Sequence, residues 1–341
     1  MKFNSSRRVI MKKLGIMTFI GVTCLLLALL LAFPGTGVCA GKKYKVCITQ
    51  IVTHPDLDTG RDKFLEGMKE QGFEEGKNIE YIIKSAEGDM SVATSIARYF
   101  VSLKPDCIFV MTTPSSQAMV KAAEGTDIPV IFGLVTDPVA AGLVPSWDKP
   151  GPNVTGISDW ADVPTQIRYI KKIMPNIKSL GIIYNAGEVN SKVQRDEVVK
   201  FAPSVNLKIV EANAPATAEV YAASKSLVGR VDAMWFPTDN TIFSAVDALF
   251  KVAEGNKIPV FGSAIGQVEH GCAAGAGVDL GVIGKECSVI VGKILRGEAK
   301  PSDIKPSKTK RMIHAVNLPA AKRMGITIPQ SVIDSADIVY K

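Results

Sequence analysis

Short apolar runs alternate with amphipathic stretches along most of the chain, and this alternation is the feature that most limits the possible folds. Between the runs, apolar residues recur three or four positions apart, as in Phe64, Leu65 and Met68, which is the period of a helix. Strand-like runs separated by helical stretches are typical of a parallel sheet with helices on both faces. In the first half the predicted strands lie at 44–51, 78–86, 106–112 and 128–135.

The same pattern starts again in the second half, with predicted strands at 179–185, 207–213, 232–238 and 258–263. The stretch DCIFVMTTPSS resembles DAMWFPTDNT in layout, and each is followed, after a helical stretch, by Ile-Pro-Val and then Phe-Gly. A duplicated unit explains this echo, although two generic α/β units can also coincide. The predicted fold class is therefore α/β, with two doubly wound, Rossmann-like parallel-sheet lobes.

The last third of the chain does not form a third domain. One amphipathic helix is predicted at 281–298, followed by a short strand and terminal helices that pack back on the lobes. We expect lobe 1 to comprise 41–157 plus about 277–308, and lobe 2 to comprise 158–276 plus about 309–341. A chain that crosses several times between two lobes forms a multi-crossing hinge.

Residues 1–40 are typical of a signal peptide. A basic start precedes an apolar run from Leu14 to Phe33, and Val38-Cys39-Ala40 has the small-x-small form of a cleavage site. We expect cleavage after about Ala40 and a periplasmic protein. The apolar run is also long enough to span a bilayer, so a membrane anchor with the protein facing the periplasm stays open. Cys39 raises a lipoprotein alternative, but Val38 fits a lipobox poorly.

Charge excludes a nucleic-acid-binding class. The net charge is +7, but five basic residues and no acids lie in the first 40 positions. The other 35 basic residues nearly balance the 33 acids, so no basic face for nucleic acid is expected.

Cysteine usage indicates neither zinc nor dithiol chemistry. Four cysteines follow the leader, and none belongs to a CxxC or Cys/His cluster. Cys47 and Cys107 fall in strand-like runs, where a thiol behaves as a small hydrophobe. In an exported protein the pair to examine for a disulfide is Cys272–Cys287; the sequence leaves the thiol state open.

Polar residues follow the predicted strands at their carboxyl ends, where open α/β sheets bind ligands. Thr136 and Thr238 are among them, and two facing lobes would line one cleft with both sets. The predicted ligand-binding residues are His54, Leu57, Asp58, Thr112, Thr113, Pro114, Ser115, Ser116, Asp137, Pro138, Ser158, Trp160, Asn185, Glu188, Asn190, Ser191, Asp239, Asn240 and Ser263.

The types of these residues suit a small zwitterion. Hydroxyls and free backbone N–H groups at the helix start after Thr112 favour a carboxylate or another anion, although plain N-capping by Ser115 or Ser116 is an alternative. Glu188 and Asp239 can hold an ammonium group, or they can be solvated loop acids. Trp160 can offer an aromatic wall; for Trp235 we expect core packing instead.

Catalytic and cofactor motifs are lacking. The three histidines, His54, His270 and His314, are far apart and show no metal-ligand spacing, and no GxSxG, P-loop or GxGxxG stretch occurs. His54, Asp56 and Asp58 share one loop, but they precede a helix whose first turn favours acids anyway. We therefore expect no catalytic residue, no cofactor and no metal.

Several motifs together resemble those of the ABC-transporter substrate-binding family that includes the tryptophan/tyrosine-type binding proteins. They include THPDLD, TTPSSQA, IPVIFGLVTDPVAAGLV, GPNVTGIS, IYNAGEVNS, PTDN and VNLPAAKRMGITIP, and they cover most of 44–341 in order. The resemblance implies a type I periplasmic binding fold. It implies cleft-lining roles for His54, Asp58, the 112–116 loop, Asp137, the 185–191 loop and the Asp239-Asn240 pair. One departure is TTPSS, where many relatives have Gly-Thr-Pro-Ala-Ala.

The resemblance also implies partners. We expect a monomer that closes around an amino-acid-like solute and delivers it to an ABC permease in the inner membrane with its cytoplasmic ATPase. An aromatic or hydrophobic amino acid fits best, with its carboxylate at Ser115 and Ser116 and its ammonium near Glu188 or Asp239. A periplasmic sensory module is the alternative, and a periplasmic enzyme using His54 with Asp58 is a further one.

Overall fold

The computed structural model describes residues 42–309 and 311–341. The predicted signal peptide at 1–40 lies outside these residues. Within the described ranges, no helix combines the length and the apolar character needed to cross a membrane.

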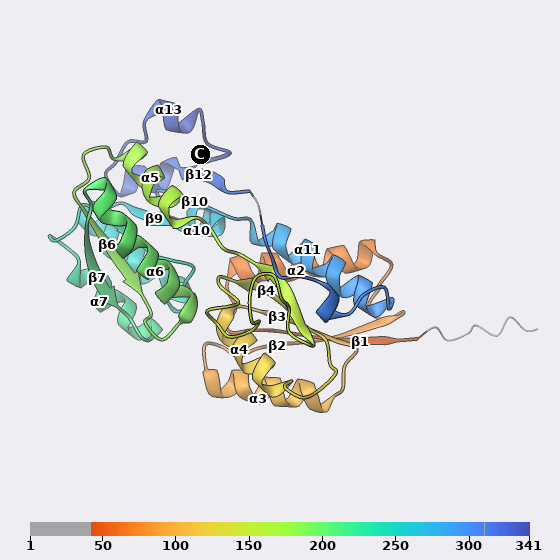
Figure 1. The fold of residues 1–341 in the computed structure, drawn as a ribbon. Helices are drawn as coiled ribbons and strands as arrows, with labels where there is room; N and C mark the ends of the chain where they lie inside the picture. Colours follow the sequence, from red (N-terminus) through yellow and green to blue (C-terminus); the bar gives the residue numbers. More distant parts are fainter. Residues whose placement is uncertain (1–41, 310) are drawn as a thin grey trace, which may run out of the picture. The chain divides into compact units, whose positions relative to one another are not determined.

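A six-stranded sheet, as far as the described residues show, forms what we call lobe 1. Its strand order is β11-β5-β4-β3-β1-β2, and all its pairs are parallel (Figure 1). The strands are β1 (Tyr44–Gln50), β2 (Ile79–Ser85), β3 (Cys107–Met111), β4 (Val130–Val135), β5 (Val154–Ser158) and β11 (Ser307–Lys308). The helical segments are α2 (Pro55–Glu70), α3 (Met90–Ser102), α4 (Thr113–Ala122), α11 (Leu280–Leu295) and the 3₁₀ turn η3 (Pro301–Asp303).

Both faces of this sheet are buried. Along β3, Cys107, Phe109 and Met111 join one apolar cluster that contains residues of α2 and α11. Ile108 and Val110 point the other way and join a cluster that contains residues of α3 and α4. Because side chains alternate along a strand, a strand covered on both faces must be apolar throughout, which explains the unbroken apolar runs of the sequence.

A second sheet, of seven strands in the described part of the chain, forms lobe 2, in the order β13-β12-β10-β9-β8-β6-β7. The strands are β6 (Ser179–Tyr184), β7 (Lys208–Asn213), β8 (Ala233–Trp235), β9 (Val260–Gly262), β10 (Ala274–Gly277), β12 (Ile313–Asn317) and β13 (Ile338–Tyr340). The helical segments are α5 (Val163–Ile173), α6 (Val189–Phe201), η1 (Ala202–Val205), η2 (Thr217–Glu219), α7 (Val220–Ser226), α8 (Asn240–Ser244), α9 (Val246–Asn256), α10 (Ile265–His270), α12 (Leu318–Arg323) and α13 (Gln330–Ile333). One departure from a parallel sheet is the antiparallel pair β10–β12.

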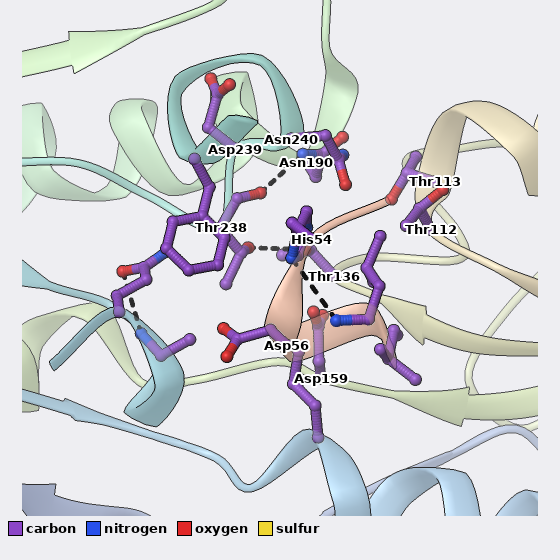
Figure 2. A pocket seen from close by; sticks show the side chains of 16 residues that line it. His54, Asp56, Thr112, Thr113, Thr136, Asp159, Asn190, Thr238, Asp239 and Asn240 are labelled. Atoms are coloured by element: carbon purple, nitrogen blue, oxygen red, sulfur yellow. Dashed lines mark hydrogen bonds between the residues drawn. The ribbon is translucent and has the colours of Figure 1, made fainter. Parts of the chain in front are cut away.

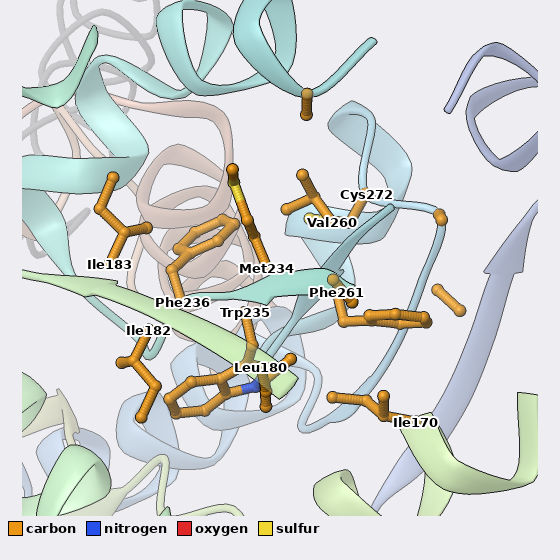
Figure 3. Packing of buried hydrophobic residues seen from close by; sticks show 14 of the residues in the cluster. Ile170, Leu180, Ile182, Ile183, Met234, Trp235, Phe236, Val260, Phe261 and Cys272 are labelled. Atoms are coloured by element: carbon orange, nitrogen blue, oxygen red, sulfur yellow. The ribbon is translucent and has the colours of Figure 1, made fainter. Parts of the chain in front are cut away.

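The core of lobe 2 is a single apolar cluster (Figure 3). Trp235 on β8 lies in it fully buried, together with Phe236 and Phe261. This confirms the expectation that Trp235 packs in the core rather than facing a ligand.

The chain passes between the two sheets three times within the described residues: between β5 and α5, between β10 and α11, and between β11 and β12. The predicted multi-crossing hinge is therefore present. The residue limits that we assigned to each lobe stay a prediction.

Strand β10 was not among the predicted strands. Its sequence, Ala-Gly-Ala-Gly, contains no β-branched or aromatic residue. A Cβ atom at Gly277 would lie 2.4 Å from the carbonyl oxygen of Ser263, so the neighbouring backbone comes too close for a larger residue. Tertiary crowding, and not strand propensity, accounts for this composition.

The four cysteines of the described chain are free thiols, and all are buried. Cys272 lies in the lobe 2 cluster and Cys287 in a lobe 1 cluster, so the pair that we singled out is not a disulfide. Burial raises the pKa of Cys47 to about 12 and raises the pKa of the other three thiols as well. These thiols are therefore unreactive core residues.

Candidate functional site

Polar strand ends from both lobes surround a small cavity (Figure 2). Its volume of about 30 Å³ leaves room for one or two waters and excludes a whole amino acid. Its lining residues are His54, Asp56, Leu57, Thr112, Thr113, Leu134, Thr136, Asp159, Asn190, Thr238, Asp239, Asn240, Phe243, Ala264, Gln267 and Leu280. Seven of the predicted binding residues are in this set: His54, Leu57, Thr112, Thr113, Asn190, Asp239 and Asn240.

The start of α4 brings unsatisfied hydroxyls to this cavity. Thr112 is the N-cap, with φ 75° and ψ 149°, a conformation that glycine tolerates and threonine rarely adopts. Its side chain makes no capping bond. Among the described residues, the buried hydroxyls without a hydrogen-bond partner include those of Thr112, Thr113, Ser115 and Ser116.

Buried polar groups are normally hydrogen-bonded, so four such hydroxyls around one helix start need an explanation. The alternative that Ser115 or Ser116 caps the helix does not hold, because neither hydroxyl bonds a backbone N–H in the described structure. Together with the N-terminal dipole of α4, a ten-residue helix, these donors suit an anionic group.

Asp159 brings a carboxyl group to the same cavity. It follows β5, is 4% exposed and lines the same cavity. Its Oδ1 atom has no hydrogen-bond partner within the described ranges. Burial raises the pKa of Asp159 to about 6, and a hydrogen bond from the Thr136 side chain acts against this increase. A buried carboxylate with an unused oxygen is a natural receptor for an ammonium group.

Glu188 and Asp239, the predicted ammonium receptors, are already occupied by bonds within lobe 2. Glu188 accepts hydrogen bonds from the side chains and backbone N–H groups of Asn240 and Thr241, and from Asn190. Asp239 accepts from the Asn185 backbone at 2.6 Å, from the Ser191 hydroxyl at 2.6 Å and from the Ile242 backbone at 2.8 Å. Burial, followed by the Glu188 carboxylate, raises the pKa of Asp239. The structure therefore gives both acids a role in shaping the loops.

The side chains of His54, Asp56 and Asp58, which are close in sequence, lie in different environments. His54 caps α2, and burial, followed by the charge of His270, lowers its pKa to about 3, so the imidazole is neutral. Asp56 is buried against lobe 2, and burial raises its pKa to about 7. Asp58 is not in the cavity lining; it forms an ion pair with Arg61 at 2.8 Å. The described residues contain no group of three potential metal ligands.

The two lobes touch one another around the cavity. The Thr136 and Thr238 hydroxyls lie 3.0 Å apart, and the Gln194 side-chain amide donates to both. The His54 ring meets the Phe243 ring edge-on, with centroids 4.7 Å apart. A larger solute must therefore separate these contacts before it enters.

A wider groove of about 510 Å³ adjoins the cavity and shares Asn240 with it. Apolar residues of both lobes line it, among them Ile51, Val52, Met90 and Pro215. The predicted binding residues Pro114, Asn185 and Glu188 line this groove. Its volume falls in the range of small-molecule sites.

The remaining predicted residues have other partners. The Asp137 carboxylate accepts from the Val139 and Ala140 backbones, next to the buried Pro138. The Ser158 hydroxyl donates to the Thr136 carbonyl oxygen, and the Ser263 backbone N–H donates to Gln267. The Lys308 ammonium group lies 4.6 Å from the ring centroid of Trp160 and also lies over the ring of Trp147.

Several lining residues were not predicted to contact a ligand, namely Asp56, Asp159, Leu134, Phe243, Ala264, Gln267 and Leu280. The signal for Asp159 was present, because it follows an apolar strand, as the other strand-end residues do. That strand, β5, was not among the predicted ones, and of the residues at its carboxyl end only Ser158 and Trp160, on either side of Asp159, were predicted to bind the ligand. Phe243 and Leu280 are apolar, and no strand-end rule selects them.

Comparisons with known proteins agree with this arrangement. The tyrosine-binding protein of Clostridioides difficile is 40% identical over 258 residues, which are 76% of this chain and 74% of that protein. A solved ABC domain from Streptococcus pneumonia in complex with L-Trp is 32% identical, with a TM-score of 0.83, covering 87% of this chain and 100% of that one. The ligand-free, open structure of a substrate binding protein with adhesive properties from Clostridium difficile is 38% identical, with a TM-score of 0.66, covering 87% and 99%.

The chain is thus closer in structure to the L-Trp-bound relative than to the open one, although its sequence is closer to the latter. This agrees with the contacts between the lobes. The family model described as ABC transporter substrate binding protein matches residues 45–340. The two sheets have the fold of type I periplasmic binding proteins. The chain belongs to the family of ABC transporter substrate-binding proteins.

Proposed function

We propose that the protein binds an aromatic L-amino acid between its lobes and delivers it to an ABC permease. The observation that carries the proposal is the pairing of unsatisfied groups in one cavity. Asp159 offers a buried carboxylate oxygen, and the start of α4 offers buried hydroxyl donors, with none of these atoms bonded among the described residues. An α-amino acid carries the two complementary charges on one carbon atom.

The ammonium group is assigned to Asp159, in place of Glu188 and Asp239. Those two acids already accept hydrogen bonds from backbone and side-chain donors of their own lobe. A solute ammonium would add little to them, whereas it would supply the missing partner of Asp159 Oδ1. The carboxylate group is assigned to Thr112 and Thr113, which line the cavity; Ser115 and Ser116 follow them on α4 and are not in its lining.

The aromatic side chain is assigned to the groove beside the cavity. The cavity is too small for it, while the groove of about 510 Å³ has apolar walls from both lobes. The names of two relatives, a tyrosine-binding protein and a domain bound to L-Trp, support an aromatic ligand.

Binding is proposed to favour the closed lobes. A solute that contacts Asp159 and α4 in lobe 1 and Asn190 and Asn240 in lobe 2 stabilises the closed state through its differential affinity for it. The closed monomer then docks on an inner-membrane permease with its cytoplasmic ATPase. The periplasmic location, with cleavage after about Ala40, belongs to the same proposal.

Isothermal titration calorimetry on the full chain tests the assignment of Asp159. We compare L-tryptophan with indole-3-propionate, which lacks the ammonium group. Asp159→Asn is expected to weaken L-tryptophan binding by more than about tenfold, because one partner of a desolvated charge pair is lost. Binding of indole-3-propionate is expected to stay the same or to improve.

The matched control is Asp148→Asn, since the Asp148 side chain is 91% exposed. It should leave both affinities unchanged. Equal losses for the two ligands in Asp159→Asn would remove Asp159 from the ammonium site. If no aromatic amino acid binds the wild-type chain, the ligand class itself is wrong.

A further inference from the structure

A second pocket lies in lobe 2, away from the cavity, along one face of α5. Thr165, Arg168, Tyr169 and Lys172 line it from the helix, at spacings of three and four residues that place them on one side. His314 of β12 and Ser335, which follows α13, complete it. Its volume is about 270 Å³.

The Tyr169 hydroxyl has no hydrogen-bond partner within residues 42–309 and 311–341, although the residue is only 6% exposed. Its ring packs edge-on against His314, with centroids 4.7 Å apart. Burial, followed by the charge of Asp337, raises the pKa of Tyr169 to about 12, so the group remains an O–H donor. An unsatisfied buried donor that lines a pocket indicates a missing acceptor.

Two cations flank this donor. Arg168 and Lys172 are four residues apart on the helix, a spacing at which like charges repel. Neither forms an ion pair with a described residue; Lys172 bonds the Ser335 hydroxyl at 3.0 Å, and Arg168 stacks over Phe201.

Asp337, the acid whose charge acts on Tyr169, is already engaged. Asp337 Oδ1 accepts from Arg311 at 2.7 Å, and Oδ2 accepts from the His314 backbone N–H at 2.9 Å. Its charge is therefore largely compensated by partners outside the Arg168–Lys172 pair. The pocket keeps two exposed cations that form no ion pair with a described residue, and the hydroxyl groups of Thr165 and Tyr169. The Ser335 hydroxyl already donates to the Ser331 carbonyl oxygen at 2.9 Å.

We propose that this pocket binds a phosphoryl group. A phosphoryl group carries several acceptor oxygens and up to two negative charges, which match two cations and the unsatisfied Tyr169 hydroxyl in one pocket. A simple carboxylate would satisfy fewer of these donors. The group can belong to free phosphate or to the headgroup of an anionic lipid, and the test separates these sources. The inference does not depend on the proposed amino acid.

The test is calorimetry on the full chain in neutral detergent, with inorganic phosphate and, separately, with a short-chain phosphatidic acid. Saturable binding with a Kd of about 1 mM or below is expected for at least one of them. The double variant Arg168→Gln/Lys172→Gln is expected to weaken it by about tenfold or more, since charged hydrogen bonds are lost. Lys225→Gln/Lys251→Gln, which removes two exposed charges from other helices of the same lobe, is the matched control.

Tyr169→Phe keeps the ring and removes only the unsatisfied hydroxyl. Without phosphate, the variant should unfold at the same urea concentration as the wild type or at a higher one. Its affinity for inorganic phosphate should be several-fold weaker than that of the wild type. Binding of phosphatidic acid alone supports a lipid source. Absence of saturable binding to both probes, or equal losses in the site and control variants, overturns the proposal.

Discussion

Gly266 offers a direct test of whether closure of the two lobes sets solute affinity. It lies in the first turn of α10, in lobe 2, and a Cβ atom there would sit 1.3 Å from Oδ1 and 2.3 Å from Cγ of Asp56 in lobe 1. Asp56 is buried and its side chain is short, so it has little room to move aside. Gly266→Ala should therefore obstruct the contact between the lobes without disturbing either lobe alone.

The size of the effect follows from overpacking. An added methyl group in a packed contact costs about 1–3 kcal/mol, here only in the closed state. If affinity depends on closure, this corresponds to roughly 5- to 150-fold weaker binding of L-tryptophan. The free energy of unfolding should stay the same or rise by up to about 1 kcal/mol, because alanine is the better helix former.

Calorimetry with L-tryptophan and urea unfolding measure the two quantities. The control is Gly255→Ala in α9, where a Cβ atom meets nothing within 4 Å. Asp56→Ala removes the opposing side chain, so in that background Gly266→Ala should cost nothing further. Unchanged affinity in Gly266→Ala, or the same loss in both backgrounds, would show that this contact between the lobes does not set the affinity.

Three further predictions follow from single sites. Thr112→Gly should raise the free energy of unfolding by about 1 kcal/mol, because glycine relieves a strained backbone, while it weakens amino acid binding; urea titration and calorimetry check both. In the folded protein the pKa of Asp159 is raised from 3.8 to about 6. Between these pH values the folded state therefore binds more protons than the unfolded state, so the wild type loses stability as the pH rises through this range. As the pH rises from 4 to 7, the free energy of unfolding of Asp159→Asn should therefore increase by up to about 3 kcal/mol relative to that of the wild type. Curves of unfolding free energy against pH that run parallel for the two proteins would contradict this. Peptide mass spectrometry after alkylation should find four cysteines modified only in denaturant: Cys47, Cys107, Cys272 and Cys287.

Local patterns in the sequence determined the fold class. An apolar run buried on both faces and a 3.6-residue period each need only neighbouring residues, so four strands of each sheet and the short strand β12 could be located from the sequence. The same reasoning located Thr112, Thr113, Asn190 and Asp239 at the cleft, because parallel strands end at one edge of their sheet. Strands β5, β10, β11 and β13 were not predicted, and β10 has glycines because the backbones of Gly262 and Ser263 lie too close for a larger residue.

Which polar groups are available to a ligand depends on long-range contacts in the folded chain. The sequence presents Glu188, Asp239 and Asp159 alike, as acids in loops. In the folded chain the first two accept hydrogen bonds from residues up to 54 positions away, while Asp159 Oδ1 has no partner among the described residues. Whether a buried charge is satisfied depends on donors brought together by the fold, and sequence spacing carries no record of them.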